Sequence, residues 1–278
     1  MQTGYAREIG GRAEQQDAVT VLAAPDGRHH LLVVADGMGG HEDGARAART
    51  AIATAERLWM ACGGQPGDPP ALLDSIFREA HAALIGGTRA SAGRAGTTLV
   101  ALYTSPATAW WAHCGDSRLY HFENDHCMSR TRDHTRVQEL FEAGVIREDE
   151  MATHPQQNQL LQALGVVNPI RVTHGRAAVT PHTRFLLCTD GFWEHIDRSE
   201  MASLLSSRDL LVETAGRAAE AARRGGARGD NVAVATWRRG PPQPPPLHAR
   251  LGAAIRPTLA LSLLLAVVLA ILFWPMDP

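Results

Sequence analysis

Four aspartates stand beside a glycine where an apolar run of residues begins or ends. Asp36 and Asp190 come directly after such runs, and Asp116 comes shortly after a third. Asp230 comes just before a fourth. Strands hold carboxylates with little positional freedom, and a neighbouring glycine lets a carbonyl group or a water molecule approach closely. The repeated pattern therefore predicts carboxylates that are placed for chemistry.

Carboxylates that converge repel one another unless a cation lies between them. Hard divalent cations such as Mg²⁺ and Mn²⁺ prefer carboxylate, carbonyl and water oxygens. A single Asp-Gly pair is weak evidence, because the same dipeptide is common in ordinary turns. Its recurrence in one chain favours a metal site built from carboxylates.

The charge and cysteine content exclude several other classes of site. Lys+Arg number 27 against 29 Asp+Glu, a formal charge of −2, so no basic field favours a nucleic-acid partner. The four cysteines, Cys62, Cys114, Cys127 and Cys188, form no C-x-x-C pair. A zinc site or a disulfide framework is therefore not expected, and a reducing compartment fits best. The first residues contain no apolar signal-peptide core, so we expect the bulk of the chain not to be exported.

Apolar runs and alanine-rich stretches predict the elements that must hold these aspartates. Strands are predicted at Leu31–Ala35, Thr97–Tyr103, Ala109–His113, Arg184–Cys188 and Asn231–Trp237. Helices are predicted at Gly44–Cys62, Leu72–Ile85, Thr135–Ala143 and Leu210–Arg224. The second and third strands are joined by a short Pro-containing link, which is typical of a hairpin. We therefore expect a layered α/β domain with mostly antiparallel strands rather than a doubly wound parallel sheet.

The composition changes near Gly240. The proline run of residues 241–246 predicts a stiff linker over 240–254, after a folded domain of residues 1–239. The segment Thr258 to Trp274 carries no charge and would form roughly 25 Å of helix, against about 30 Å for the apolar part of a bilayer. We predict a transmembrane helix over 255–274, followed by a short tail of residues 275–278. A buried helix of the domain is the alternative. Arg250 and Arg256, which precede the uncharged segment, predict that the domain stays in the cytoplasm.

Short motifs spread over about residues 3 to 238 resemble the PPM family, also called protein phosphatase 2C, and particularly its bacterial branch. Each motif alone is weak, but their order and spacing follow the family. The matching stretches are Arg12–Asp17, Asp36–His41, Ala95–Thr98, Gly115–Arg118, Asp133–Leu140, His154-Pro155, Asn158, Ala163–Gly165, Asp190–Glu194 and Gly229–Asn231.

This resemblance implies an α+β fold, a four-layer sandwich of two antiparallel sheets flanked by helices. It also implies two Mn²⁺ or Mg²⁺ ions that share Asp36, with a water between them attacking phosphorus. Asp190 and Asp230 would hold the first ion, and the Gly37 carbonyl would help to hold the second. Asp116 and Glu194 would join Asp190 around a third, weaker ion. Arg12 matches the arginine that grips the phosphate, a role that suits a planar guanidinium.

Gln16 departs from the family pattern, and His41 has more than one possible role. Gln16 stands where the family usually has a glutamate that binds the second metal, so that site loses a negative charge and we expect a higher metal demand. His41 follows two glycines near the proposed site, where it would be a general acid for the leaving oxygen, or a residue that caps a helix or meets solvent. The segment Thr131–Gly165 would form a mobile flap beside the metals, with Thr135 capping a helix.

We therefore expect a phosphatase that hydrolyses phosphoserine and phosphothreonine on cytoplasmic proteins and reverses a serine/threonine kinase. Its C-terminal helix would anchor it by a single pass in the inner (cytoplasmic) membrane. One alternative is a membrane-tethered pseudo-phosphatase that binds phosphoproteins with little or no turnover, which Gln16 favours. Another is a hydrolase of small phosphate esters.

Overall fold

The computed structural model describes residues 1–39, 42–86, 95–157 and 159–240. Within these ranges, no helix is both long enough and apolar enough to cross a membrane. The predicted transmembrane helix over 255–274 and the proline run of the linker lie outside the described residues. His41 and Asn158 lie outside them as well.

Two five-stranded sheets form the centre of the domain, and every strand pair in them is antiparallel. The first sheet has, in spatial order, β1 (Gln2–Glu8), β12 (Val232–Arg238), β11 (Thr183–Cys188), β8 (Arg118–Glu123) and β9 (His126–Arg130). The second has β10 (Thr173–Ala178), β7 (Thr108–Cys114), β6 (Leu99–Thr104), β3 (His30–Ala35) and β2 (Ala18–Ala23). A short pair, β4 (Gly37–Met38) and β5 (Gly96–Thr97), lies beside Asp36.

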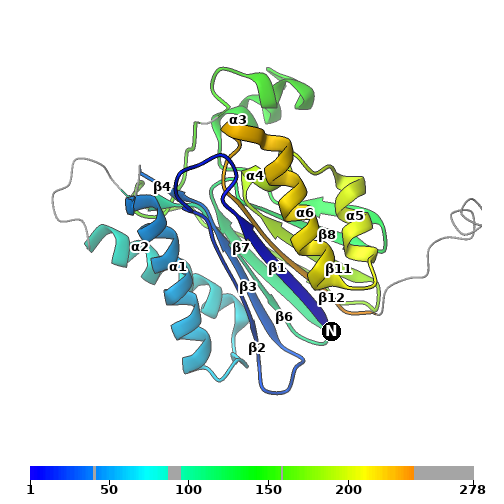
Figure 1. Ribbon diagram of the computed structural model, residues 1–278. Coiled ribbons are helices and arrows are strands. Elements are labelled where there is room, and N and C mark those ends of the chain that lie inside the picture. The colour runs from blue at the N-terminus through cyan, green and yellow to red at the C-terminus, as the bar shows by residue number, and fades with distance from the viewer. Residues whose placement is uncertain (40–41, 87–94, 158, 241–278) are drawn as a thin grey trace, which may run out of the picture. The chain divides into compact units, whose positions relative to one another are not determined.

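Helices cover the outer face of each sheet (Figure 1). The second sheet carries α1 (Glu42–Ala61) and α2 (Pro69–Gly86), and the first carries α5 (Arg198–Ser206) and α6 (Leu210–Gly225). The other helical segments are α3 (Arg136–Glu142), α4 (Asp190–Trp193) and the 3₁₀ turns Glu148–Thr153 and Gly226–Arg228. The order helix, sheet, sheet, helix confirms the predicted four-layer sandwich of two antiparallel sheets.

The central strands are mostly apolar because both of their faces are buried. In β3, Leu32 and Val34 pack between the sheets, whereas Leu31 and Val33 pack under α1 and α2. Successive side chains of a strand point to opposite faces, so a strand with a core on each side needs apolar residues throughout. This burial makes the strands that end at the aspartates rigid supports.

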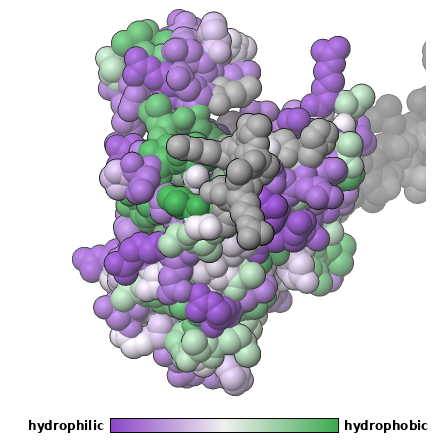
Figure 2. Space-filling model, turned by 90° about the vertical axis from the view of Figure 1, so that its left-hand side faces the viewer, coloured by the Kyte–Doolittle hydropathy of each residue, from purple (hydrophilic) through white to green (hydrophobic). Residues whose placement is uncertain are grey.

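The outer surface fits this layered arrangement, because the apolar sides of α1 and α2 pack on the second sheet. Figure 2 shows the face that carries α1 and α2, which is mostly hydrophilic. The apolar side chains visible there gather mainly just below the topmost segment, which carries α3.

The predicted hairpin is confirmed, since β6 and β7 pair from Leu99 with Cys114 to Thr104 with Ala109. The predicted strand Thr97–Tyr103 is divided at Thr98 into β5 and β6. The Thr98 N–H donates to the Asp36 carbonyl at 2.9 Å. The elements missed from the sequence are β1, β2, β4, β8, β9, β10, α4, α5 and the two 3₁₀ turns. Strands β1, β2, β9 and β10 are sheet edges, and the edge strand β10 alternates half-buried with exposed residues, so no apolar run marks it.

Candidate metal centre

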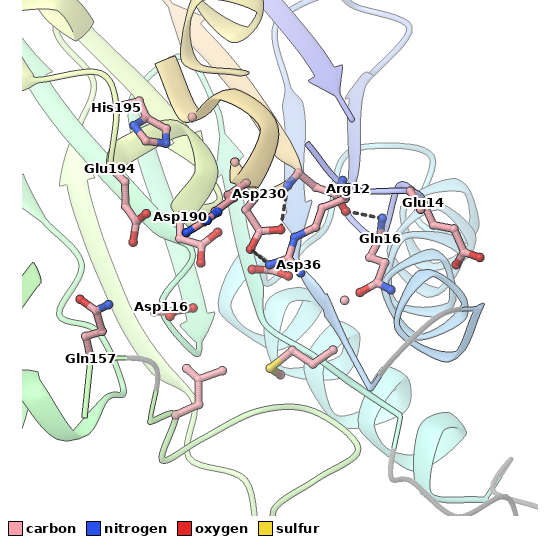
Figure 3. A pocket seen from close by; sticks show the side chains of 18 residues that line it. Arg12, Glu14, Gln16, Asp36, Asp116, Gln157, Asp190, Glu194, His195 and Asp230 are labelled. Carbon is pink, nitrogen blue, oxygen red and sulfur yellow. Dashed lines mark hydrogen bonds and ion pairs between the residues drawn. The ribbon is translucent and has the colours of Figure 1, made fainter. Parts of the chain in front are cut away.

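A cavity of about 720 Å³ opens at the edge of the sandwich where β3, β7 and β11 end and β12 begins. Figure 3 shows the carboxylates of Asp36, Asp116, Asp190 and Asp230 around this cavity. The predicted site residues Arg12, Gln16, Gly37 and Glu194 line it too. The structure therefore brings together every predicted site residue except His41, which lies outside the described residues. Glu14, Gln157 and His195 also line the cavity and were not predicted.

The backbone of Asp36 is fixed by two threonines of the Ala95–Thr98 motif. The Asp36 carbonyl accepts from the Thr97 hydroxyl at 2.8 Å and from the Thr98 N–H at 2.9 Å. The Thr98 hydroxyl lies 2.7 Å from the Ser117 hydroxyl. A Cβ on Gly115 would lie 2.6 Å from the Thr98 side chain, and Gly115 has a φ of +108°. The loop that carries Asp116 is therefore braced on the residues that hold Asp36.

Asp190 and Asp230 are held against each other by the ends of β11 and β12. The Thr189 N–H donates to the Ala233 carbonyl at 3.0 Å, and the Ala233 N–H donates to the Thr189 hydroxyl at 2.9 Å. A Cβ on Gly191 would lie 2.1 Å from the Asn231 carbonyl, so the first turn of α4 needs glycine there. These contacts place the two aspartates side by side at the cavity wall.

Burial and mutual repulsion raise the pKa values of Asp36, Asp116 and Asp190. The pKa of Asp36 is raised well above its ordinary value by burial, and then by the nearby Asp17, Asp190, Asp116 and Asp230. The pKa of Asp190 is likewise raised by burial and by neighbouring aspartates. Burial raises the pKa of Asp116 to about 7. Such a cluster favours protons or cations between its members.

Asp17 belongs to the same cluster, although the sequence did not single it out. Its side chain is only 3% exposed, and it accepts from the Thr189 hydroxyl at 2.7 Å. Burial raises its pKa to about 7. Its place inside the Arg12–Asp17 motif was the available signal. Asp17 stands behind Asp36 and Asp190 and adds negative charge without facing the cavity.

Arg12 lies at the cavity mouth and forms an ion pair with Asp230. Its Nη2 is 2.6 Å from the Asp230 carboxylate, and its side chain is 57% exposed. The hydrogen bond and charge of Asp230 raise the pKa of Arg12, with smaller effects of Asp190 and Asp36. A guanidinium has five donors, so one contact to Asp230 leaves others for a phosphate group in the cavity.

Gln16 and Gly37 lie together on the side of the cavity next to α1. A Cβ on Gly44 would lie 2.8 Å from the Gly37 carbonyl oxygen and 2.9 Å from Gln16 Oε1. The Gly37 carbonyl oxygen and Gln16 Oε1 therefore both lie next to Gly44, near the start of α1. The Gln16 N–H donates to the Asn231 side chain at 2.7 Å, which ties this loop to Asp230 (Figure 3). Gly44 was missed because its role depends on this close approach.

The donor set fits divalent cations that keep part of their water shell. Among the described residues, no group of three or more His, Cys, Asp or Glu side chains is placed to hold a metal ion by itself. Mg²⁺ is usually bound through one or two carboxylates and several waters, so a full cage is not required. Partly exposed carboxylates around an open cavity, with raised pKa values, have the chemistry of such a site.

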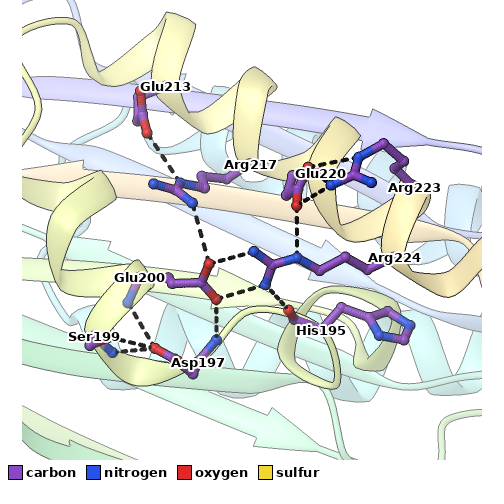
Figure 4. A network of polar contacts seen from close by, with 9 residues as sticks. All are labelled: His195, Asp197, Ser199, Glu200, Glu213, Arg217, Glu220, Arg223 and Arg224. Carbon is purple, nitrogen blue, oxygen red and sulfur yellow. Dashed lines mark hydrogen bonds and ion pairs between the residues drawn. The ribbon is translucent and has the colours of Figure 1, made fainter.

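A network of charged side chains joins the segment after Asp190 to the helix before Asp230 (Figure 4). Arg224 of α6 donates to the His195 carbonyl at 2.6 Å and to Glu200 at 2.8 and 2.6 Å. It also donates to Glu220 at 2.8 Å. His195 follows Glu194, and α6 leads through Gly226–Arg228 to Asp230. Arg224 therefore sets the separation of the two chain segments at the cavity.

We expect Arg224→Ala to raise several-fold the Mn²⁺ concentration that gives half-maximal activity, because the segments carrying Glu194 and Asp230 lose their bridge. The rate at saturating Mn²⁺ should fall less. Arg223→Ala is the matched control, since Arg223 pairs with Glu220 and is 72% exposed. The measurement is a Mn²⁺ titration of both variants. Equal Mn²⁺ requirements in the two variants would contradict this role.

The comparisons with known proteins agree with this geometry. The family model for protein phosphatase 2C matches residues 4–224. The serine/threonine phosphatase stp of Listeria innocua is 31% identical over 189 residues, which cover 66% of this chain and 75% of that protein. The structure of the S. agalactiae serine/threonine phosphatase superposes with a TM-score of 0.74 at 26% identity, and the match covers 85% of this chain and 99% of that one.

A further solved structure is the catalytic domain of the serine/threonine protein phosphatase PstP in complex with two manganese ions. It has a TM-score of 0.70 and 28% identity, and the match covers 84% of this chain and 96% of that one. The family model spans most of the described domain and includes Asp36, Asp116 and Asp190. The chain therefore belongs to the protein phosphatase 2C, or PPM, family of bacterial serine/threonine phosphatases.

Proposed function

We propose that this chain hydrolyses phosphoserine and phosphothreonine on proteins with the help of two Mn²⁺ or Mg²⁺ ions. The observation that carries the proposal is the set of mutually repelling carboxylates of Asp36, Asp190, Asp116 and Asp17 beside the exposed guanidinium of Arg12. The relative solved with two manganese ions supports the choice of cation. We assign a third, weaker ion to Asp116, Glu194 and Asp190.

Each residue would have a distinct task. Asp36 would be shared between the two ions, with Asp190 and Asp230 on the first and the Gly37 carbonyl on the second. Bound ions of this kind activate water and neutralise charge on the phosphoryl oxygens. Arg12 would bind the phosphate through the donors that Asp230 does not use, and so align it in the cavity. His41 stays a proposed general acid for the leaving oxygen.

A panel of substrates tests this function with the full-length chain and added Mn²⁺. We expect phosphate release from phosphothreonine and phosphoserine peptides, and much slower release from nucleotides and phosphotyrosine peptides. Preferred hydrolysis of nucleotides would instead support the small-ester hydrolase. Turnover that is absent, or unchanged in Asp190→Ala, would support the pseudo-phosphatase.

Gln16 is the one feature that favours weak turnover, because an amide oxygen offers a cation less charge than a carboxylate. We expect Gln16→Glu to lower about tenfold the Mn²⁺ concentration for half-maximal activity, since cation affinity follows the charge of the ligands. Glu14→Gln, a change of charge on the same loop, is the control. The measurement is a metal titration of peptide hydrolysis. Equal metal affinities in the natural chain and Gln16→Glu would contradict the argument.

We propose further that a helix over 255–274 anchors the enzyme in the inner membrane with its domain in the cytoplasm, close to substrates of a serine/threonine kinase. The uncharged segment Thr258–Trp274 after Arg250 and Arg256 supports this. Anchoring would raise the effective concentration of the enzyme near membrane-bound substrates.

The anchor is tested by fractionating cells that make the full chain or a chain ending at Arg239. We expect the full chain in the membrane pellet, resistant to high salt, and the shortened chain in the supernatant. Full-length chain in the supernatant would rule the anchor out.

A further inference from the structure

A second cavity, of about 310 Å³, adjoins the metal centre. The two cavities share the lining residues Asp116, Gln157, Asp190 and Glu194. One wall comes from the segment 131–157, which carries α3, and the other from α4, α5 and the loop between them. A peptide whose phosphate sits at the metal centre would therefore place neighbouring residues at the second cavity.

Three of the charged side chains that line this cavity, Arg118, Arg130 and Asp133, already pair with one another. Arg118 donates to both oxygens of Asp133, at 2.9 and 2.6 Å, and its guanidinium lies 3.4 Å from the centre of the Trp193 ring. It also donates to the Tyr120 hydroxyl at 3.2 Å. Arg130 lies 3.6 Å from Asp133, whose side chain is only 4% exposed. A charged ligand that binds to these three residues would have to break their pairs, so this part of the wall does not favour one.

Apolar side chains complete the cavity from both walls. Val137 and Met151 come from the segment 131–157, and Ile196 and Met201 come from the α4–α5 side. The indole of Trp193 lies on the same side, under Arg118. Two methionines and an aromatic ring can adapt to apolar groups of different shape. The size of the cavity suits a single large side chain.

We propose that this cavity, the side-chain pocket, binds a large apolar side chain of the phosphoprotein within about three residues of the phosphorylated one. The proposal rests on the phosphatase function and makes it more specific. An extended peptide advances by roughly 3.3–3.6 Å per residue, so a residue near the phosphate reaches an adjoining cavity. Burying a leucine or phenylalanine side chain there should strengthen binding about tenfold or more relative to leaving it exposed.

The test is a panel of phosphothreonine peptides in which leucine, phenylalanine, alanine, glutamate or lysine is placed in turn at each of three positions on either side. We expect kcat/KM to be at least about tenfold higher with leucine or phenylalanine than with alanine at one position, and lower with either charge. Hydrolysis of para-nitrophenyl phosphate, which lacks neighbouring residues, reports the metal centre alone.

Substitutions of residues that line the cavity test whether the cavity causes the preference for an apolar side chain. Val137→Phe narrows the pocket and should reduce the preference for leucine, whereas Met151→Ala widens it and should favour phenylalanine. Both should keep turnover of para-nitrophenyl phosphate, which also shows that they fold. Val145→Phe is the control, because Val145 is 67% exposed and does not line the cavity.

The outcomes separate this proposal from the proposed function. A flat peptide profile with normal turnover overturns the side-chain pocket and leaves the phosphatase in place. A preference that neither variant changes, or that Val145→Phe changes equally, also overturns the pocket. Loss of turnover on para-nitrophenyl phosphate and on every peptide by the natural chain contradicts the phosphatase function itself.

Discussion

Asp36→Asn is expected to lower turnover of a phosphothreonine peptide by about a thousandfold. Asp36 lies at the centre of the acidic cluster and would bind both ions, so the amide weakens both at once. Bound cations contribute several kcal/mol to a phosphoryl transfer, and each 1.36 kcal/mol corresponds to a factor of ten in rate. The measurement is kcat and kcat/KM for phosphate release over a Mn²⁺ titration.

The same change should stabilise the metal-free chain against urea. The pKa of Asp36 is raised by burial and by four neighbouring aspartates, so its charge is unfavourable when no cation is bound. The control is Asp26→Asn. Asp26 also precedes a glycine, but it does not line the cavity. Asp26 is an exposed turn residue that accepts from the Arg28 N–H at 2.8 Å, so its variant should keep full turnover. An Asp36→Asn chain that is inactive and also less stable would indicate a structural role instead.

The stability of the metal-free chain is expected to fall as pH rises from about 4 to 8. Burial raises the pKa of Asp17 and of Asp116 from 3.8 to about 7. Between these values, the folded chain holds more protons than the unfolded chain, so raising the pH removes stability. Stability stops falling once both groups are ionised in both the folded and the unfolded state, at about pH 8.

Mn²⁺ should reverse this trend, because the ions replace the protons and bind the ionised carboxylates. An excess of one hundred times the dissociation constant corresponds to about 2.7 kcal/mol for one site. The measurement is urea unfolding in EDTA and in Mn²⁺ at a series of pH values, with the Asp36→Asn chain as the control that responds weakly to Mn²⁺. Stability that increases with pH in EDTA would contradict the assigned electrostatics.

The strands that carry the aspartates, and the convergence of these aspartates, could be predicted because they depend on local signals. The run Leu31–Ala35 is apolar throughout because both faces of β3 are buried, and the same pattern marks β11. An aspartate directly after such a strand reaches the edge of the sheet. The family resemblance assigned Arg12 and Asp230 to one site, and the structure shows that these residues pair although they lie 218 positions apart in the chain.

Other features could not be predicted because they depend on contacts between distant segments. The edge strand β10 alternates its exposure and contains no apolar run. The brace between Thr98 and Ser117 and the close approach of Gly44 to Gly37 exist only in the folded chain. The side-chain pocket likewise forms where two separate segments, carrying Val137 and Met201, line one cavity.

The account is tested most directly by titrating Mn²⁺ into the metal-free full-length chain while measuring both bound ions and hydrolysis of a phosphothreonine peptide. We predict no turnover without cation, and turnover that rises as two ions bind to each chain. The Asp36→Asn chain should bind fewer ions and stay inactive. Full turnover by a chain stripped of divalent cations in EDTA would contradict the assignment of the acidic cavity as a metal-dependent phosphatase centre.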